Sequence, residues 1–309
     1  MNKRSFSREF AILVSCLGLL VLILLTLMPR PALPAAALGG APLPPPPALD
    51  SEAYFVRVAG EASPLMARRS WKRMAPASLT KIMTALVARE RLAPDARVVF
   101  SPEAKAVEER RSDAAAGEIF LRDDAVRMAL MESANDAGLA LAEAVGAKSG
   151  KAGFGERVAL FVRLMNDRAQ ALAMRDTHFE NPVGLDAPGH LMSAEDLARL
   201  ADEAFVRDPG LFAITREINA VVFSWGGKKH TILNTDELLK EFPAIAGGKT
   251  GFTDNAKGTL LLLYPVTAKE GISAAPLAPR QKIAIIVILK SADRFADGRK
   301  IINWLEENF

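Results

Sequence analysis

The stretch Pro76-Ala77-Ser78-Leu79-Thr80-Lys81-Ile82-Met83-Thr84-Ala85-Leu86-Val87 combines a helical pattern with two reactive side chains. From Ser78 to Glu90 the apolar residues recur at intervals of three and four, which predicts a helix that begins just after Pro76. Ser78 and Lys81 then share one face of the first turn, so the lysine amine can reach the serine hydroxyl. The helix dipole also favours negative charge at this end. The pattern suits a serine nucleophile with a lysine as its base.

Two further motifs add weight to this pair, because Ser-x-x-Lys alone arises by chance on the order of once in a chain this long. Ser133-Ala134-Asn135 and Lys249-Thr250-Gly251 follow in the order that penicillin-recognising serine enzymes use. Taken alone, the first could be an ordinary turn between helices. Lys148-Ser149-Gly150 also fits the last pattern, but it lies in a polar, glycine-rich connection where a loop is expected.

Other catalytic arrangements have little support in the sequence. The histidines are His178, His190 and His230, and no serine stands in a Gly-x-Ser-x-Gly turn, which argues against a Ser-His-Asp triad. No two histidines have the helical spacing of zinc ligands, and the single cysteine, Cys16, lies in an apolar N-terminal run. We therefore expect no metal, no cofactor and no disulfide.

The N-terminal region predicts a membrane attachment. Residues 10–28 form an uncharged apolar run of 19 residues that follows Lys3, Arg4 and Arg8. This predicts an anchor over residues 1–28, with its basic end in the cytoplasm. A cleaved signal peptide is the alternative, because the small residues at 35–37 offer a cleavage site. Residues 29–50 are rich in proline and alanine and predict an extended linker. Residues 51–309 then form the main domain outside the cytoplasm.

The main domain has the composition and pattern of an α/β protein of the α+β type. Half of the 309 residues are apolar, and the net charge of +3 argues against nucleic-acid binding. Strands are predicted at both chain ends and helices in between, so the sheet combines both ends. The predicted strands span 53–58, 64–68, 259–266 and 283–289. The predicted helices span 78–90, 123–131, 136–145, 156–172, 194–205 and 297–308.

From about residue 53 onward, the sequence resembles the D-alanyl-D-alanine carboxypeptidases, the low-molecular-mass penicillin-binding proteins of serine peptidase family S11. Four stretches carry the resemblance: 76–81, 133–137, 178–185 and 248–253, which read PASLTK, SANDA, HFENPVGL and GKTGFT. The resemblance implies a serine β-lactamase/DD-peptidase-like fold, in which helices flank a five-stranded antiparallel sheet. The site is expected between the sheet and the helical region.

The resemblance also implies the roles of three catalytic residues. Ser78 is expected to attack the carbonyl of the penultimate D-Ala of a peptidoglycan stem peptide that ends in D-Ala-D-Ala. Lys81 takes the proton of Ser78, and Ser133 relays a proton toward the departing D-Ala. The expected activity is therefore that of a serine-type D-Ala-D-Ala carboxypeptidase, with β-lactams as covalent inhibitors.

The same resemblance implies a set of substrate-binding residues. Asn135 is expected to position the substrate and Lys81, while Lys249 and Thr250 face the substrate carboxylate. Gly251 belongs to the same strand. The backbone amides of Ser78 and Phe252 are expected to form the oxyanion hole. A second cation at Lys249 also favours the neutral form of Lys81.

Three competing functions share these motifs. A class A β-lactamase needs a deacylating glutamate, typically in a Glu-x-x-Leu-Asn stretch, which the sequence lacks. A DD-endopeptidase uses the same catalytic groups, and a non-catalytic β-lactam sensor or cell-wall binding module can retain them. Two departures from the family pattern bear on substrate detail: Lys257 stands between Ala256 and Gly258, and Asp236 stands where Asn is common.

Overall fold

The computed structural model describes residues 43–150, 152–266 and 282–309. These residues belong to one compact unit, Ala35–Phe309. The predicted anchor at 1–28 and most of the linker at 29–50 lie outside the described residues, and both stay predictions. Within the described ranges, no helix combines the length and the apolar character that crossing a bilayer requires.

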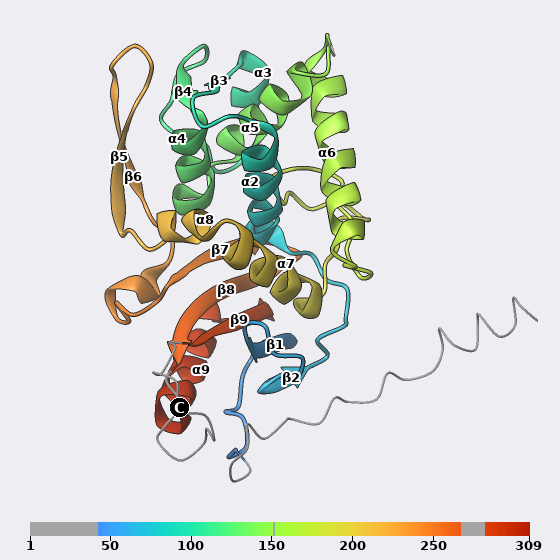
Figure 1. The fold of residues 1–309 in the computed structure, drawn as a ribbon, viewed down its shortest axis with the longest axis vertical. Coiled ribbons are helices and arrows are strands. Elements are labelled where there is room, and N and C mark those ends of the chain that lie inside the picture. Colours follow the sequence, from blue (N-terminus) through green and yellow to red (C-terminus); the bar gives the residue numbers. More distant parts are fainter. Residues whose placement is uncertain (1–42, 151, 267–281) are drawn as a thin grey trace, which may run out of the picture. The chain divides into compact units, whose positions relative to one another are not determined.

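A five-stranded antiparallel sheet, in the order β2-β1-β9-β8-β7, combines both ends of the described chain (Figure 1). Its strands are β1 (Ala53–Val58), β2 (Met66–Arg68), β7 (Gly247–Thr253), β8 (Lys257–Val266) and β9 (Lys282–Ser291). The long apolar runs of β8 and β9 are buried on both faces, because the central strands of a covered sheet have no face in water. The predicted sheet of both chain ends is confirmed, and β7 lies at its edge.

Each face of the sheet packs against helices. Helix α9 (Arg294–Asn308) covers one face, where Leu260, Leu262 and Ile288 join Ile301 and Leu305 in one core. Leu261 and Val287 point to the other face, into a larger core shared with the helical region. This alternation follows from the pleat, which sends successive side chains to opposite faces. Figure 1 shows α7 (Ala194–Arg207) and α8 (Pro209–Ile214) lying across this second face.

The helical region is built around α2 (Thr80–Arg91), α5 (Asn135–Ala147) and α6 (Phe154–Ala171). The short helix α3 (Pro102–Lys105) packs beside α5. Ser193 begins α7 as predicted, since its hydroxyl accepts a hydrogen bond from the amide of Asp196 at 3.2 Å. The helix predicted at 123–131 is divided into α4 (Arg122–Arg127) and a π-helical turn, η2 (Met128–Glu132).

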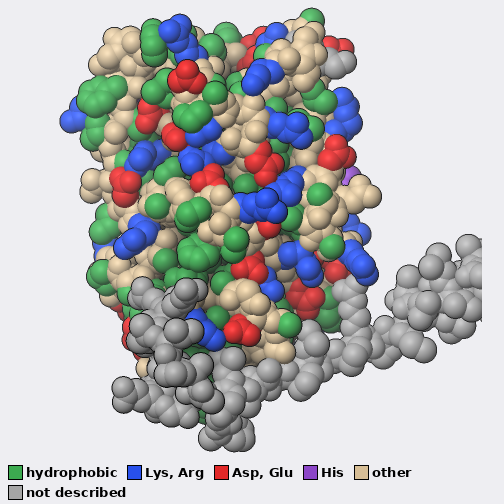
Figure 2. Space-filling model, in the orientation of Figure 1, with side chains coloured by type: hydrophobic (Ala, Val, Ile, Leu, Met, Phe, Trp, Pro, Cys, Tyr) green, Lys and Arg blue, Asp and Glu red, His purple; other side chains and the backbone are tan. Residues whose placement is uncertain are grey.

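Two small two-stranded sheets were not predicted from the sequence. They pair β3 (Arg97–Val99) with β4 (Ile119–Leu121) and β5 (Asn219–Phe223) with β6 (Lys229–Leu233). Three-residue strands are too short to show a pattern, which explains why β3 and β4 escaped sequence analysis. Figure 2 shows basic and acidic side chains interspersed over the visible face, which agrees with a nearly neutral domain.

The β7–β8 hairpin accommodates Lys257 without a bulge between its strands. Thr253 pairs with Lys257, and the register stays regular back to the pair of Gly247 and Leu263. Lys257 itself adopts a left-handed conformation with φ 54° at the end of a three-residue loop. The register shift of β8 occurs instead against β9, between Gly258 and Leu260.

Candidate active site

Ser78 lies in a short 3-10 turn, η1 (Ala77–Leu79), that leads directly into α2. The turn is held from two sides. Thr80 donates a hydrogen bond from its hydroxyl to the carbonyl oxygen of Ala77 at 2.9 Å. Gly184, with φ +87°, packs so closely that an added Cβ would lie 1.9 Å from the same oxygen. Only glycine fits at 184, because both the conformation and the space exclude a side chain.

The amine of Lys81 is buried and reaches Ser78 as the helical spacing predicts. It lies 2.9 Å from the Ser78 hydroxyl, 2.7 Å from Oδ1 of Asn135 and 2.7 Å from the carbonyl oxygen of Val183. Burial, and next the charge of Arg110, lower the pKa of Lys81 to about 7. A neutral amine has two N–H groups and one lone pair. The two carbonyl oxygens can take the N–H groups, which leaves the lone pair for the proton of Ser78.

The second motif joins the site at the start of α5. Ser133 ends the π-helical turn in a left-handed conformation, φ 66°, and both Ser133 and Asn135 line a cavity beside Ser78. The amide of Asn135 donates to the carbonyl oxygen of Arg110 at 2.8 Å, which fixes the segment 106–114 against this motif. Asp136 holds the other end of that segment, because its buried carboxylate accepts hydrogen bonds from the amide and hydroxyl of Ser112.

The third motif lies on β7, where the threonine side chain lines the cavity and the lysine side chain is buried behind it. Thr250 lines the cavity, and its hydroxyl lies 2.6 Å from that of Thr235. Lys249 is only 1% exposed, does not line the cavity, and donates to the carbonyl oxygen of Thr250 at 2.8 Å. Burial, and next the charge of Lys81, hold the pKa of Lys249 well below its usual value. Neighbours on a strand point to opposite faces, so the Lys249 amine lies behind the lining of the cavity, and its contact with the substrate carboxylate stays a prediction.

Strand β7 passes very close to the nucleophile turn. A Cβ on Gly251 would lie 2.9 Å from the amide nitrogen of Ser78 and 2.4 Å from the hydroxyl of Thr259. The cavity between β7 and the helical region has a volume of about 260 Å³. Gly251 and Phe252 line it together with Ser78, so six of the eight predicted residues line a single cavity. The two lysines, Lys81 and Lys249, are buried behind this lining.

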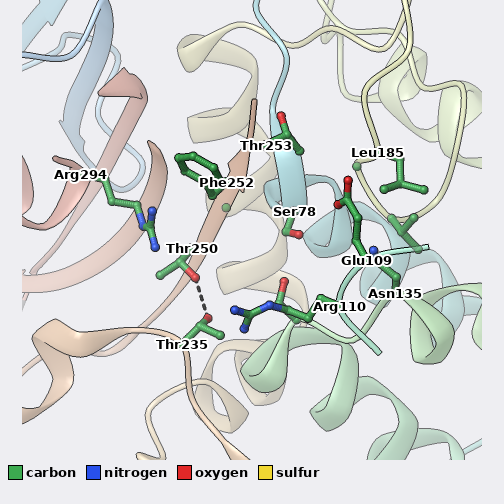
Figure 3. Close-up of a pocket in the computed structure, with 14 residues that line it drawn as sticks. Ser78, Glu109, Arg110, Asn135, Leu185, Thr235, Thr250, Phe252, Thr253 and Arg294 are labelled. Atoms are coloured by element: carbon green, nitrogen blue, oxygen red, sulfur yellow. Dashed lines mark hydrogen bonds between the residues drawn. The ribbon is translucent and has the colours of Figure 1, made fainter. Parts of the chain in front are cut away.

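Three further charged residues line the cavity and were not predicted: Glu109, Arg110 and Arg294. Figure 3 shows Arg294 and Thr250 on one side of Ser78 and Glu109 on the other. Arg294 comes from the first turn of α9, far from any motif, and Glu109 and Arg110 come from a loop. No sequence signal marks them, because folding alone brings them to the site.

One histidine, His190, lies close to the nucleophile helix but does not line the cavity. His190 is buried beneath the nucleophile helix, with Nε2 2.8 Å from the Thr80 hydroxyl and Nδ1 accepting from the amide of Glu180. Burial lowers the pKa of His190 to about 4, so it is neutral at pH 7. No histidine lines the cavity. Among the described residues, no group of three or more His, Cys, Asp or Glu side chains is placed to hold a metal ion.

A lysine-paired serine at the start of a helix, beside the edge strand of a five-stranded sheet, defines an enzyme fold of the penicillin-binding and DD-peptidase class. The match to a solved DD-transpeptidase, from Streptomyces K15, confirms this fold with a TM-score of 0.72. The match covers 85% of this chain and 99% of that one at 23% identity. More specifically, the chain belongs to the D-alanyl-D-alanine carboxypeptidase family, peptidase family S11, whose sequence profile matches residues 44–273.

Curated relatives support the family assignment. The chain is 31% identical over 293 residues to the D-alanyl-D-alanine carboxypeptidase DacD of Salmonella typhimurium, which covers 90% of this chain and 68% of that protein. It is 31% identical over 211 residues to DacF of Bacillus subtilis, also a D-alanyl-D-alanine carboxypeptidase, which covers 66% of this chain and 50% of that protein. The chain thus spans about half to two thirds of the length of these relatives.

Proposed function

We propose that this chain is a serine-type D-Ala-D-Ala carboxypeptidase that removes the terminal D-Ala from peptidoglycan stem pentapeptides. The observation that carries the proposal is the buried Lys81 amine, which lies 2.9 Å from the Ser78 hydroxyl. Its pKa of about 7 allows a large neutral fraction at physiological pH. The family and its relatives supply the substrate class.

The proposed reaction proceeds through an ester on Ser78. The Ser78 oxygen attacks the penultimate D-Ala carbonyl carbon while its proton passes to Lys81. The carbonyl oxygen becomes an oxyanion, which the backbone amides of Ser78 and Phe252 stabilise. The C–N bond then breaks, and a proton relayed through Ser133 reaches the departing D-Ala amine. Water hydrolyses the ester in the second half-reaction, which regenerates the Ser78 hydroxyl.

The terminal carboxylate of the substrate is proposed to bind at the β7 end of the cavity. The Thr250 hydroxyl and the Arg294 guanidinium face this end (Figure 3). A guanidinium suits a carboxylate because it offers paired N–H donors in one plane. The buried side chain of Lys249 lies behind the lining of the cavity, and it acts on the site through its charge and through its hydrogen bond to the carbonyl oxygen of Thr250. Asn135 orients Lys81 and lines the acyl side of the cavity.

Membrane attachment belongs to the proposal as well. The apolar run at 10–28 supports an anchor that places residues 51–309 outside the cytoplasm, with the proline-rich segment 29–50 as a spacer. A cleaved signal peptide would give the same location without attachment. Expression of the full chain in bacteria separates the two: an anchored enzyme sediments with membranes at full mass, whereas a cleaved one is shorter and released.

The activity is tested by combining a release assay with penicillin labelling of the full chain. We expect release of D-Ala from a peptide that ends in D-Ala-D-Ala, slow-reversing acylation by labelled penicillin, and loss of both in Ser78→Ala. Labelling without D-Ala release would instead indicate a sensor, and rapid turnover of the drug a β-lactamase. Cleavage of cross-linked muropeptides in preference to monomeric pentapeptides would indicate an endopeptidase.

A further inference from the structure

Glu109 is a charged residue of the cavity that the proposed reaction does not use. It lines the same cavity as Ser78, and its side chain is exposed to solvent. Among the described residues, no hydrogen bond or ion pair of its carboxylate is found, whereas other acids of the helical region, such as Glu118 and Asp123, are paired. An ionised carboxylate is an acceptor only, so the group that it can bind must be a donor.

The backbone holds Glu109 in this place in a conformation that few residues with a side chain adopt. Its φ is 62°, in the left-handed region. Hydrogen bonds on both sides fix this conformation: the carbonyl oxygen of Glu108 accepts from Asn135 Nδ2 at 3.4 Å, and that of Arg110 accepts from the Asn135 amide at 2.8 Å. Arg110 also donates from Nη1 to the carbonyl oxygen of Glu132 at 3.2 Å. Such strain persists where the surroundings determine it, and it concentrates at binding sites.

The positive charge of Arg294 and the negative charge of Glu109 lie at opposite ends of the cavity (Figure 3). Figure 3 shows Arg294 and Thr250 on one side of Ser78, while the Glu109 carboxylate lies on the opposite side. The Arg110 guanidinium points toward Thr235 and away from that carboxylate. A peptide whose terminal carboxylate lies at Arg294, and whose scissile carbonyl lies at Ser78, therefore extends its acyl part toward Glu109.

We propose that Glu109 is a specificity-determining residue that binds a free ammonium group on the acyl part of the substrate, on the residue that precedes D-Ala-D-Ala. The substrate class is then a stem peptide with a diamino acid at that place and its side-chain amine unmodified. An ammonium group is a cation with three donors, which matches an exposed acceptor of opposite charge. This inference rests on the proposed carboxypeptidase activity.

A second effect of Glu109 has to be separated from recognition. Its charge also acts on Lys81, where it raises the pKa against the larger effects of burial and Arg110. Removing that charge changes the rate for every substrate alike. Recognition of an ammonium group instead changes the ratio between two substrates that differ only in that group. The ratio is therefore the decisive readout.

The test compares two pentapeptides that differ only in the third residue, lysine with a free ε-amine or Nε-acetyl-lysine. We expect the wild-type full chain to favour the free amine by about 1.5- to 5-fold in kcat/KM, as an exposed ion pair allows. Glu109→Gln should bring the ratio to about 1, while the matched control Glu108→Gln, an exposed neighbour that does not line the cavity, keeps it. Glu109→Lys should favour an Nε-succinyl peptide instead.

Equal rates for both peptides in the wild type, or an unchanged ratio in Glu109→Gln, would overturn the inference while D-Ala release itself continues. Failure of the proposed function is distinct, because neither peptide would then release D-Ala. Added salt provides a second readout: the wild-type preference should fall as ionic strength rises, since an exposed ion pair is screened.

Discussion

The Lys81 amine lies 2.9 Å from the Ser78 hydroxyl, and both of its other partners are carbonyl oxygens that can only accept. Protonated Lys81 can donate to all three oxygens, whereas the neutral amine has a lone pair left for Ser78. The protonation state of Lys81 therefore decides whether this contact activates the nucleophile or merely binds it.

We expect kcat/KM for D-Ala release to rise with pH and to reach half of its maximum near pH 7. The pKa of Lys81 is lowered to about 7, and only the deprotonated form is a base, so activity is lost as pH falls below this value. Lys81→Arg keeps the positive charge but cannot deprotonate, and it should lower acylation by about 10²- to 10⁴-fold. Initial rates between pH 5 and 9 check both.

One neighbouring carboxyl titrates in the same range and needs its own control. Burial, and next the charge of Asp113, raise the pKa of Glu132 to about 7. Glu132→Gln should keep the rising limb of the pH profile if that limb belongs to Lys81. A profile that becomes flat in this variant would assign the limb to Glu132 instead.

Arg294→Ala should weaken recognition of the substrate carboxylate. A lost hydrogen-bonded contact to a charged group amounts to about 1.5–3 kcal/mol, so kcat/KM should fall by about 10- to 150-fold. A peptide with an amidated C terminus lacks the carboxylate and should show little further loss. Arg299→Ala is the matched control on the same helix, because Arg299 pairs with Glu241 at 2.7 Å and does not line the cavity. Equal losses for both peptides would contradict the assignment.

Local spacing explains why much of the site could be predicted from the sequence. Ser78 and Lys81 meet because three residues make nearly one helical turn, and β8 and β9 are visible as apolar runs because both of their faces are covered. The order of the three motifs then placed Asn135 and Thr250 correctly at one cavity. All of these features depend on residues that are close in the chain or belong to a motif.

Features that arise from tertiary packing could not be predicted. Arg294 reaches the cavity because α9 begins beside Gly258 at the start of β8, and Glu109 reaches it because Asn135 holds its loop. Neither position follows from spacing along the chain. The orientation of Lys249 depends on which face of β7 each residue occupies, and a motif alone does not fix that face.

Asn181→Ala should reduce both stability and acylation. The Asn181 Oδ1 accepts hydrogen bonds from the amides of Val183, Gly184 and Leu185 at 2.8–3.1 Å, and this loop presents the Val183 carbonyl to Lys81. Loss of these acceptors should lower the free energy of unfolding by about 2–4 kcal/mol. Urea denaturation and penicillin acylation rates measure the two effects.

The control for Asn181 is Asn308→Ala, which loses a single hydrogen bond to the Trp304 carbonyl oxygen at the end of α9. It should leave acylation unchanged. If folded Asn181→Ala acylated at the wild-type rate, the loop would not position Lys81.

His190 should make the fold sensitive to acid. Burial lowers the folded-state pKa of His190 to about 4, below the ordinary value of 6.5. The unfolded chain then binds this proton first as pH falls, so stability is full above pH 6.5 and is lost progressively toward pH 4. The loss from this group amounts to up to about 3 kcal/mol. Urea denaturation at pH 7.5 and 4.5 measures it, and His190→Gln should show a smaller difference between the two pH values than the wild type.

Asp236→Asn should stabilise the protein at neutral pH. Oδ1 of Asp236 accepts from the amide of Leu238 at 3.1 Å, but Oδ2 is buried and has no hydrogen-bond partner among the described residues. Burial raises the pKa of Asp236 to about 6, against the attraction of Lys249 and Arg294. The folded state therefore binds this proton before the unfolded state does, and the carboxylate lowers stability above pH 6.

Removing that charge should raise the free energy of unfolding by about 1–3 kcal/mol at pH 7.5, and the gain should vanish below about pH 3, where the carboxyl is protonated in both states. Asp254→Asn, in the exposed β7–β8 loop, serves as the matched control and should change stability by less than about 0.5 kcal/mol. A loss of stability at pH 7.5 in Asp236→Asn would show that the attraction of the carboxylate to Lys249 and Arg294 outweighs its burial. The native Asp236 would then stabilise the two cations near it, Lys249 and Arg294. Because the charge of Asp236 raises the pKa of Lys249, the same variant should also lower that pKa further.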